Sequence, residues 1–185
     1  MGSLIASGLV SLDGFVADRE GRFDWAEPDE EVHRFVNDLS RRVGTYLLGR
    51  RLYEVMVVWD TMALEGLPDH IRDFAELWRT TDKIVYSTTL ASVTGASTRL
   101  QRTFDADAVS RLKAASERDL AVGGPGLAAH AFHAGLVDEV HLFLTPIVVG
   151  GGARFFPDDV RVRLELVDTR RFANGMVFVR YGVAR

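Results

Sequence analysis

The sequence predicts an α/β domain with a mixed, mostly parallel sheet, helices on both faces and an antiparallel hairpin at its end. Short apolar runs alternate with segments of helical periodicity as far as residue 146. Beyond that point, two strand-like runs at residues 163–172 and 176–183 flank Asn174-Gly175, a pair typical of tight hairpin turns. With 185 residues, no linker and no internal repeat, the chain is expected to form one domain over residues 1–185.

The first half of the chain begins with a buried strand and a loop. Residues 3–11 are mostly apolar, and the run ends at Asp13-Gly14, from which a loop is expected to reach Pro28. The acidic residues after Pro28 favour a helix N-terminus. The further elements expected here are helices at 29–43, 50–57 and 69–79 and strands at 45–48 and 83–86.

The second half continues the alternation before it closes with the hairpin. A short strand is expected at residues 98–101 and a helix at 105–116. Residues 120–122 form the next strand, and an alanine-rich helix follows at once. Residues 137–146 read as a long strand that leads to the hairpin.

Three of the expected strands end in residues that suit a nucleotide. Gly49 is followed by Arg50 and Arg51, one strand ends in Ser87-Thr88-Thr89, and another ends in Gly123-Gly124. In open α/β sheets, ligands bind beyond the carboxyl ends of the strands. Taken singly, such arginines are usually solvated surface charges and such a hydroxyl cluster usually caps a helix, but the combination favours a nucleotide site.

The stretch after residue 122 is a candidate phosphate cradle. Gly123, Gly124 and Gly126 let a ligand approach the backbone, and the helix that begins with Leu127 supplies free N–H groups. Residues 124–129 also match the dinucleotide-binding pattern G-x-G-x-x-A. Two alternatives stay open: a glycine-rich turn without a ligand, and an ordinary Rossmann oxidoreductase, although the motif does not follow the first strand.

Composition and charge exclude several classes of protein. The net charge of −4 and pI of about 5.7 argue against a nucleic-acid partner. The chain has no cysteine, so it has neither a disulfide framework nor a thiolate metal site. No apolar run approaches the ~20 residues of a membrane span, and no export signal is visible, so a cytoplasmic protein is expected.

The order of short motifs along the chain resembles the dihydrofolate reductase-like family. It is most similar to the branch related to the C-terminal reductase domain of riboflavin-biosynthesis proteins (RibD). The resemblance spans nearly the whole chain and implies the three-layer dihydrofolate reductase-like sandwich. The motifs that carry it are residues 11–17 (SLDGFVA), 49–54 (GRRLYE), 87–90 (STTL), 123–124 (GG) and 135–139 (GLVDE), and Pro146 with residues 150–152 (GGG).

The resemblance implies a reductase that uses NADPH, and a homodimer. The 2′-phosphate or pyrophosphate would meet the arginines, the adenosine side would meet the hydroxyls, and the pyrophosphate would lie against the glycines. Leu52 stands where relatives commonly carry a threonine, which removes one phosphate donor and predicts weaker cofactor binding. The expected cofactor-binding residues are Gly14, Gly49, Arg50, Arg51, Leu52, Ser87, Thr88, Thr89, Gly123, Gly124, Gly126 and Leu127.

Three residues are the candidates for the catalytic half of the site. Asp13 would hydrogen-bond a ring N–H or relay a proton, and Trp25 would stack on a flat heterocycle. Glu30, five residues after Trp25, stands where a reductase carboxylate would engage a pterin. The alternatives are that Asp13 is a turn aspartate before glycine, and that Glu30 with its acidic neighbours favours a helix N-terminus.

The expected function is the transfer of a hydride from NADPH to a small planar heterocycle, a pteridine or a 5-amino-6-(5-phosphoribosylamino)uracil-like compound, or to a related carbonyl or imine. The alternative is a non-catalytic nucleotide-binding or sensory domain that keeps the cofactor pocket. No metal is expected, because His130 and His133 lack further ligands nearby. The zinc deaminase signature is also missing.

Overall fold

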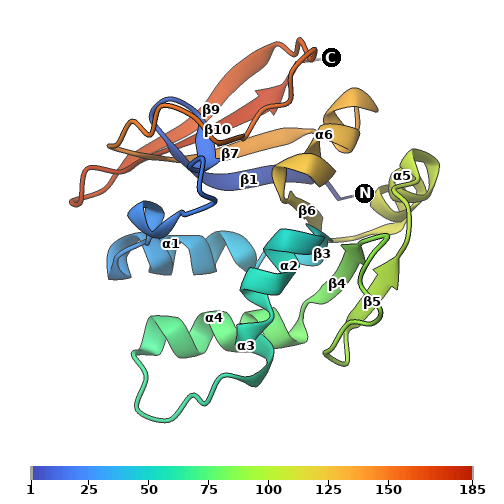
Figure 1. Ribbon diagram of the computed structural model, residues 1–185, viewed down its shortest axis with the longest axis horizontal. Coiled ribbons are helices and arrows are strands. Elements are labelled where there is room, and N and C mark those ends of the chain that lie inside the picture. Colours follow the sequence, from blue (N-terminus) through green and yellow to red (C-terminus); the bar gives the residue numbers. More distant parts are fainter. Residues whose placement is uncertain (1, 185) are drawn as a thin grey trace.

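The computed structural model describes residues 2–184 and is built around one eight-stranded sheet (Figure 1). The strands of this sheet are β1 (Leu4–Ser11), β3 (Val43–Gly49), β4 (Asp82–Tyr86), β5 (Thr98–Gln101), β6 (Asp119–Gly123), β7 (Glu139–Thr145), β9 (Leu164–Arg171) and β10 (Val177–Val183). Their order across the sheet is β5-β4-β3-β6-β1-β7-β10-β9.

The sheet is parallel over most of its width and antiparallel at one side. All neighbours from β5 to β7 pair in parallel, whereas β10 pairs antiparallel with β7 and with β9. The hairpin turns at Asn174-Gly175, where Gly175 has φ 88° and the Asn174 side chain accepts the Met176 N–H at 3.0 Å. The predicted mixed sheet and terminal hairpin are therefore confirmed.

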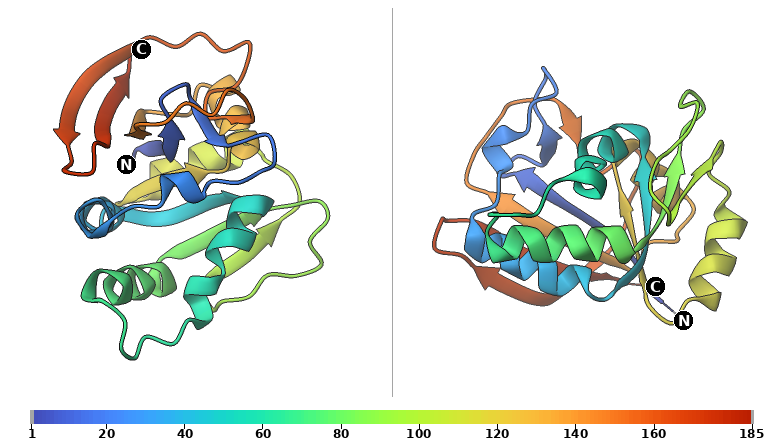
Figure 2. Two further views of the ribbon diagram at one scale, coloured as in Figure 1. Left: turned by 60° about the vertical axis from the view of Figure 1, so that its left-hand side comes forward. Right: turned by 90° about the horizontal axis from the view of Figure 1, so that it is seen from below.

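Helices cover both faces of the sheet (Figures 1 and 2). They are α1 (Glu30–Ser40), α2 (Arg50–Met56), α3 (Val58–Thr61), α4 (Asp69–Thr80), α5 (Ala106–Ala115) and α6 (Pro125–His133). The α6 residues Leu127, Ala131 and Phe132 pack with the inward side chains of β1, β6 and β7 on one face. Helices α1 and α4 pack on the opposite face, so the sheet is the middle layer of three.

Helix α1 shows how the local sequence produces this packing. Asp29 caps its N-terminus by accepting the Val32 N–H at 3.0 Å. Its apolar residues recur at helical spacing and meet an aromatic cluster of Phe143, Phe172 and Phe178 from the antiparallel side of the sheet. Burial of each such side chain contributes roughly 1.5–3 kcal/mol, which fixes α1 against the sheet.

Four short elements were not expected from the sequence. The predicted loop up to Pro28 contains β2 (Phe15–Ala17) and the 3₁₀-helix η1 (Asp24–Ala26), and β2 pairs with β8 (Ala153–Arg154). The predicted helix at 50–57 ends at Met56 and is followed by α3. Strands of two or three residues are too short to show periodicity, and each needs a partner that is distant in the sequence.

No helix within residues 2–184 has the length and apolar character needed to cross a membrane.

Candidate active site

The three predicted strand tips lie side by side at one edge of the sheet. In the register of β3, Gly49 is opposite Tyr86 of β4, which precedes Ser87, and Leu48 is opposite Gly123 of β6. The residues that follow β4, β3 and β6 therefore meet at their common carboxyl edge. The expected convergence of the tips is confirmed.

The two glycine tips touch through their backbones. A methyl group on Gly124 would lie 3.5 Å from the Gly49 Cα and 3.8 Å from the Leu52 Cβ, and Gly124 has φ 89°. A methyl group on Gly123 would overlap the Leu52 side chain. Leu52 therefore packs over Gly123. This contact gives the apolar side chain a packing role at the position where the family resemblance predicts a threonine.

The helices that follow these tips begin without a side-chain cap. The N-cap residues are Gly49 for α2 and Gly124 for α6, whereas aspartates cap α1 and α5. The first N–H groups of an uncapped helix have no partner in the helix and attract an anion. A Cβ placed at Gly126 would have no atom within 4 Å, so the first turn of α6 is open.

The two arginines after Gly49 have different surroundings. The Arg50 guanidinium is held by Glu54 Oε1 and by the Thr89 hydroxyl, both at 2.7 Å, so it links the β3 tip to the β4 tip. Arg51 is exposed, and no hydrogen bond or ion pair of its side chain is found within residues 2–184. Of the two arginines, only Arg51 has a side chain without a partner in this part of the chain.

The hydroxyl cluster after β4 also divides into two roles. Ser87 is buried, and its Oγ accepts the N–H groups of Thr89 at 3.2 Å and Leu90 at 3.0 Å, so it shapes the turn. Thr88 and Thr89 are exposed. Arg102, which the sequence analysis missed, donates to the Ser87 and Leu90 carbonyl oxygens at 3.2 and 2.5 Å. Its position just after β5 was the signal that could have found it.

Asp13 holds a glycine-rich loop against the end of β1. Its carboxylate accepts the Val149 N–H at 3.2 Å and the Gly150 N–H at 2.8 Å. Arg19 donates to the Gly150 carbonyl at 3.2 Å from the other side. The hydrogen bond from Ser11 and these two amides lower the pKa of Asp13. Asp13 is therefore ionised at neutral pH and bonded to the backbone, which agrees with the turn interpretation and gives it a positioning role.

Gly14 belongs to the same turn. It has φ 89°, and no atom lies within 4 Å of a Cβ placed there. Its carbonyl accepts the Phe155 N–H at 3.0 Å, and the Phe15 N–H donates to the Ser11 hydroxyl at 3.0 Å. Gly14 thus keeps an open backbone position at the end of β1, as the nicotinamide side of the predicted site requires.

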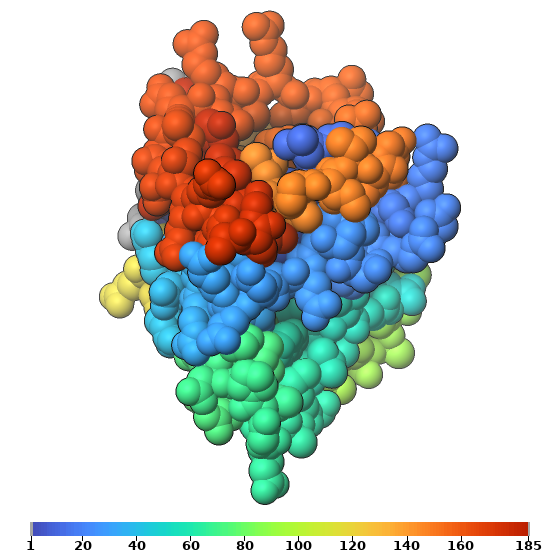
Figure 3. Space-filling model, turned by 90° about the vertical axis from the view of Figure 1, so that its left-hand side faces the viewer, coloured from blue at the N-terminus to red at the C-terminus, as the bar shows by residue number. Residues whose placement is uncertain are grey.

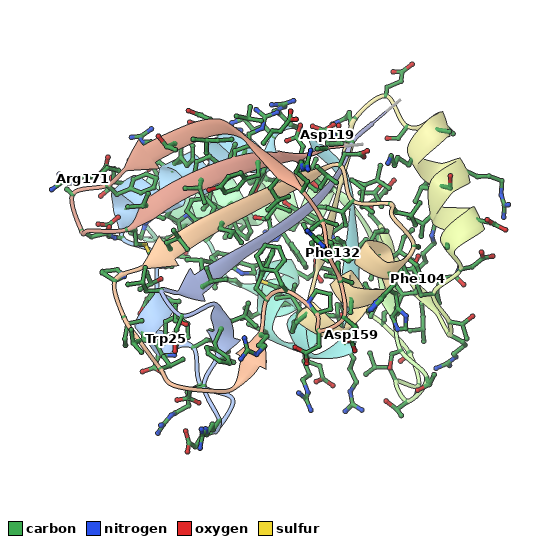
Figure 4. The ribbon with its side chains drawn as sticks, turned by 90° about the horizontal axis from the view of Figure 1, so that it is seen from above. Trp25, Phe104, Asp119, Phe132, Asp159 and Arg171 are labelled. Carbon is green, nitrogen blue, oxygen red and sulfur yellow. The ribbon has the colours of Figure 1, made fainter. Side chains whose placement is uncertain are left out.

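Trp25 and Glu30 lie on neighbouring elements but have different environments. Trp25 belongs to η1, is half-buried beyond the carboxyl end of β1 (Figure 4), and donates its Nε1–H to the Arg22 carbonyl at 3.2 Å. Glu30 lies in the first turn of α1 and is 61% exposed. Arg34 holds its carboxylate at 2.7 Å and lowers its pKa.

The acidic residues at the start of α1 all have structural partners. Asp29 caps the helix, and Glu31 accepts the Ala173 N–H and the Arg170 guanidinium, both at 3.1 Å. Together with the Glu30–Arg34 pair, these contacts support the helix N-terminus interpretation. The catalytic role of Glu30 stays a prediction, and the geometry does not favour it.

The histidines of α6 have contacts that need no metal. His130 stacks on Phe104 with ring centroids 5.6 Å apart, and His133 Nδ1 lies 2.7 Å from the Ala129 carbonyl. Within residues 2–184, no three histidine, aspartate or glutamate side chains group so that they could hold a metal ion.

A cavity of about 70 Å³ lies away from this edge. It lies between α1 and the strands β1, β3, β6 and β7, and Ile5, Ser7, Tyr46, Ala121 and His141 are among its lining residues. None of the predicted site residues lines it. The cavity is therefore distinct from the candidate site, which is a set of adjoining turns at the carboxyl edge.

Fold and site together define a reductase-type architecture. The all-parallel Rossmann alternative is wrong, because the sheet ends in an antiparallel hairpin and the glycine motif follows β6 and not the first strand of the chain. The sequence model of the RibD C-terminal domain matches residues 3–178. The chain belongs to the RibD C-terminal domain family.

Individual relatives agree with this assignment. The uncharacterized protein YyaP of Bacillus subtilis (strain 168) is 29% identical over 181 residues, which are 96% of this chain and 93% of YyaP. A putative riboflavin biosynthesis protein from Shewanella sp. PV-4 has a TM-score of 0.77 at 21% identity, with 99% of both chains covered. Dihydrofolate reductase from Enterococcus faecalis, solved with NADP(H), has a TM-score of 0.67 at 16% identity and covers 100% of this chain and 98% of its own. The dihydrofolate reductase-like fold is therefore confirmed.

Proposed function

We propose that this protein is an NADPH-dependent reductase of a small planar heterocycle, a pteridine or an aminouracil of the kind reduced in riboflavin biosynthesis, or a related carbonyl or imine. The observation that carries the proposal is the meeting of two uncapped helix N-termini and a free arginine at one edge of the sheet. Membership of the RibD C-terminal domain family supports the same reaction class.

The cofactor's phosphates fit the turns after β3, β4 and β6. The pyrophosphate would lie on the N–H groups at the start of α6, where Gly124 and Gly126 leave the backbone open. Arg51 would bind the additional phosphate of NADPH, and Thr88 and Thr89 would face the adenosine side. When bound, the nicotinamide supplies the hydride.

The protein's own contribution to the reaction is mostly alignment. Gly14 leaves space at the end of β1, and Asp13 and Arg19 hold the loop at residues 149–152 beside it. Trp25 offers an aromatic face near the same strand end. Such a site raises the rate by bringing donor and acceptor carbons to about 3–3.5 Å and by excluding water.

The test has a binding step and a turnover step. The purified protein is titrated with NADPH and NADH, and pteridines, aminouracils and simple quinones are then screened for loss of the reduced-nicotinamide absorbance. Turnover with at least one heterocycle supports the proposal. NADPH binding without turnover of any compound would favour the alternative, a non-catalytic nucleotide-binding domain, and absence of binding would refute both.

The arginines give a sharper control. The double change Arg50→Ala with Arg51→Ala should weaken NADPH far more than NADH, because only NADPH carries the additional phosphate. Equal losses for the two cofactors would show that this pair does not read the phosphate.

A further inference from the structure

Three side chains at the contact between α1 and α4 carry buried polar atoms that have no hydrogen-bond partner within residues 2–184. They are Nδ1 of His33, Oδ1 of Asn37 and Nδ1 of His70. Figures 1 and 2 show the two helices side by side, and in Figure 3 the light-blue α1 and the green α4 meet at the surface. A buried polar atom without a partner costs free energy, so three of them together indicate a ligand that they share.

The three side chains lie close together. His33 and Asn37 are one helical turn apart on α1, and His70 lies in the first turn of α4. The ring centroids of His33 and His70 are 5.1 Å apart, with an angle of 66° between the ring planes. Asn37 Nδ2 donates to the His70 carbonyl at 2.8 Å and to Asp73 Oδ2 at 2.7 Å. These two bonds use the donors of the amide and fix its orientation, so its oxygen is the atom left to bind a ligand.

The separation of the two rings suits a metal ion that both of them bind. Zn²⁺ binds imidazole nitrogen at about 2.0–2.1 Å, so two rings on one tetrahedral ion have centroids roughly 5 Å apart. Burial, and after it the neighbouring His70, lower the pKa of His33, while Asn37 acts in the opposite direction. His33 is therefore neutral at neutral pH and keeps the lone pair that a metal requires.

The surroundings of His33 are dry on one side and open on the other. Trp59 and Phe74 pack edge-on against its ring, with centroids at 6.1 and 5.6 Å, and they close the inner side. An apolar shell of this kind limits the access of water to a bound ion. His70 is only half-buried, so an ion can enter from solvent along this side chain.

Asp73 supports the amide ligand from behind. Its Oδ2 accepts the Asn37 amide at 2.7 Å, and Arg41 holds its Oδ1 at the same distance. A carboxylate that is bonded to a metal-binding side chain and not to the metal keeps that side chain in place. The site therefore has three donors, an orienting partner and an entry path.

We propose that His33, Asn37 and His70 bind a divalent transition-metal ion of the Zn²⁺ type through the two Nδ1 atoms and the amide oxygen, with solvent in the remaining positions. Imidazole nitrogen is a preferred donor for Zn²⁺, Cu²⁺ and Ni²⁺, whereas Mg²⁺ prefers oxygen. The third ligand is an amide, so the site needs neither a third histidine nor a carboxylate. The ion joins α1 to α4, and none of its ligands is a predicted residue of the reductase site.

The test measures metal binding and needs no cofactor, so its outcome is independent of the proposed function. The untagged protein is treated with a chelator and then titrated with Zn²⁺ in a calorimeter. One Zn²⁺ should bind per chain, and Mg²⁺ should not bind at these residues. His70→Gln removes one ligand at a half-exposed position and should raise the dissociation constant of Zn²⁺ by at least about tenfold.

The second histidine pair of the chain supplies the matched control. His130 and His133 lie on one face of α6, so the double change His130→Gln with His133→Gln removes the same kind of side chain elsewhere. This variant should keep the affinity of the wild type. Zn²⁺ should also raise the melting temperature of the wild type and of this control, and leave that of His70→Gln unchanged.

A measurement on the wild type decides the matter if His70→Gln does not fold. The imidazole nitrogen resonances of His33 and His70 should shift when Zn²⁺ is added, and those of the other three histidines should not. Absence of Zn²⁺ binding, an affinity that His70→Gln leaves unchanged, an affinity lost in the α6 variant, or resonance shifts confined to the other histidines would each overturn the proposal.

Discussion

Arg50 and Arg51 are neighbours in the sequence but differ in their surroundings, and we propose that Arg51 binds the additional phosphate of NADPH. Arg50 is already bonded to Glu54 and Thr89. We expect Arg51→Ala to weaken NADPH about tenfold, since a charge-assisted phosphate contact is lost, and to change NADH little. Fluorescence titration of both cofactors checks this. Glu54→Gln, which loosens Arg50 alone, is the matched control and should affect both cofactors alike.

Asp13 is expected to act through the loop that it holds. Asp13→Asn keeps one acceptor oxygen for the amides of residues 149 and 150, so cofactor affinity should be nearly unchanged while turnover falls. The pKa of Asp13 is lowered, so the carboxylate is ionised across the neutral range. Its loss should therefore leave the pH profile of kcat in place. If the fall of kcat at high pH disappears in the variant, Asp13 is instead identified as a proton donor.

The residues of the site that could be predicted are those whose chemistry is local. Gly49, Gly123 and Gly124 lie at the ends of their strands, and the register of the parallel strands places these ends side by side. Long-range partners could not be read from the sequence. The amides bound to Asp13 are more than a hundred residues away, and the packing of Leu52 on Gly123 depends on two adjacent turns.

At the scale of elements, the small sheet of β2 and β8 depends on close backbone contact. A Cβ on Gly152 would overlap the Ala17 carbonyl oxygen and the Asp18 backbone, where nothing can rotate away. Gly152→Ala should destabilise the fold by about 3 kcal/mol or unfold this sheet locally. Thermal unfolding and proteolysis near residue 153 measure the two effects.

Gly150 supplies the control for this prediction. It also has positive φ, 73°, but a Cβ there would have no atom within 4 Å. Gly150→Ala should cost only the backbone strain, about 1 kcal/mol. Equal losses of unfolding free energy in the two variants would show that the backbone conformation makes glycine necessary at position 152, and that the contact with Ala17 does not.

Elements of four or more residues in the main sheet and its longer helices were predictable because their apolar spacing is strong. The hairpin was predictable because Asn174-Gly175 favours a tight turn. The very short β2, β8 and η1 were not, since pairing with distant segments and packing on β1 determine them. The pairing of β9 with β10 is irregular between Arg180 and Tyr181, and this irregularity likewise becomes visible only in the structure.

At the scale of the whole molecule, a charged network joins β7 to β10. The Glu139 carboxylate accepts hydrogen bonds from His141 Nε2 at 2.9 Å and from Nε and Nη2 of Arg180, both at 2.8 Å. The hydrogen bond to His141 and the pairing with Arg180 lower the pKa of Glu139 from 4.5 to about 2. This stabilisation is complete above pH 4.5 and is lost as the pH falls through about 2.

Removal of the Glu139 charge should show this dependence. Glu139→Gln leaves Arg180 without its partner and should lower the free energy of unfolding at neutral pH by about 2 kcal/mol. The difference from the wild type should shrink as the pH is lowered from 4.5 toward 2. Urea unfolding at a series of pH values measures it, and a constant difference would assign the loss to packing alone.

The order of strands has a consequence for how the chain is made. β1 leaves the ribosome well before its two neighbours in the sheet, β6 and β7, which begin at residues 119 and 139. Contacts between segments so distant in sequence form slowly, and until they form the backbone N–H and C=O groups at both edges of β1 are unpaired. The nascent chain therefore exposes an aggregation-prone segment until β6 and β7 have been made, and chaperones that bind short apolar stretches should bind residues 4–11.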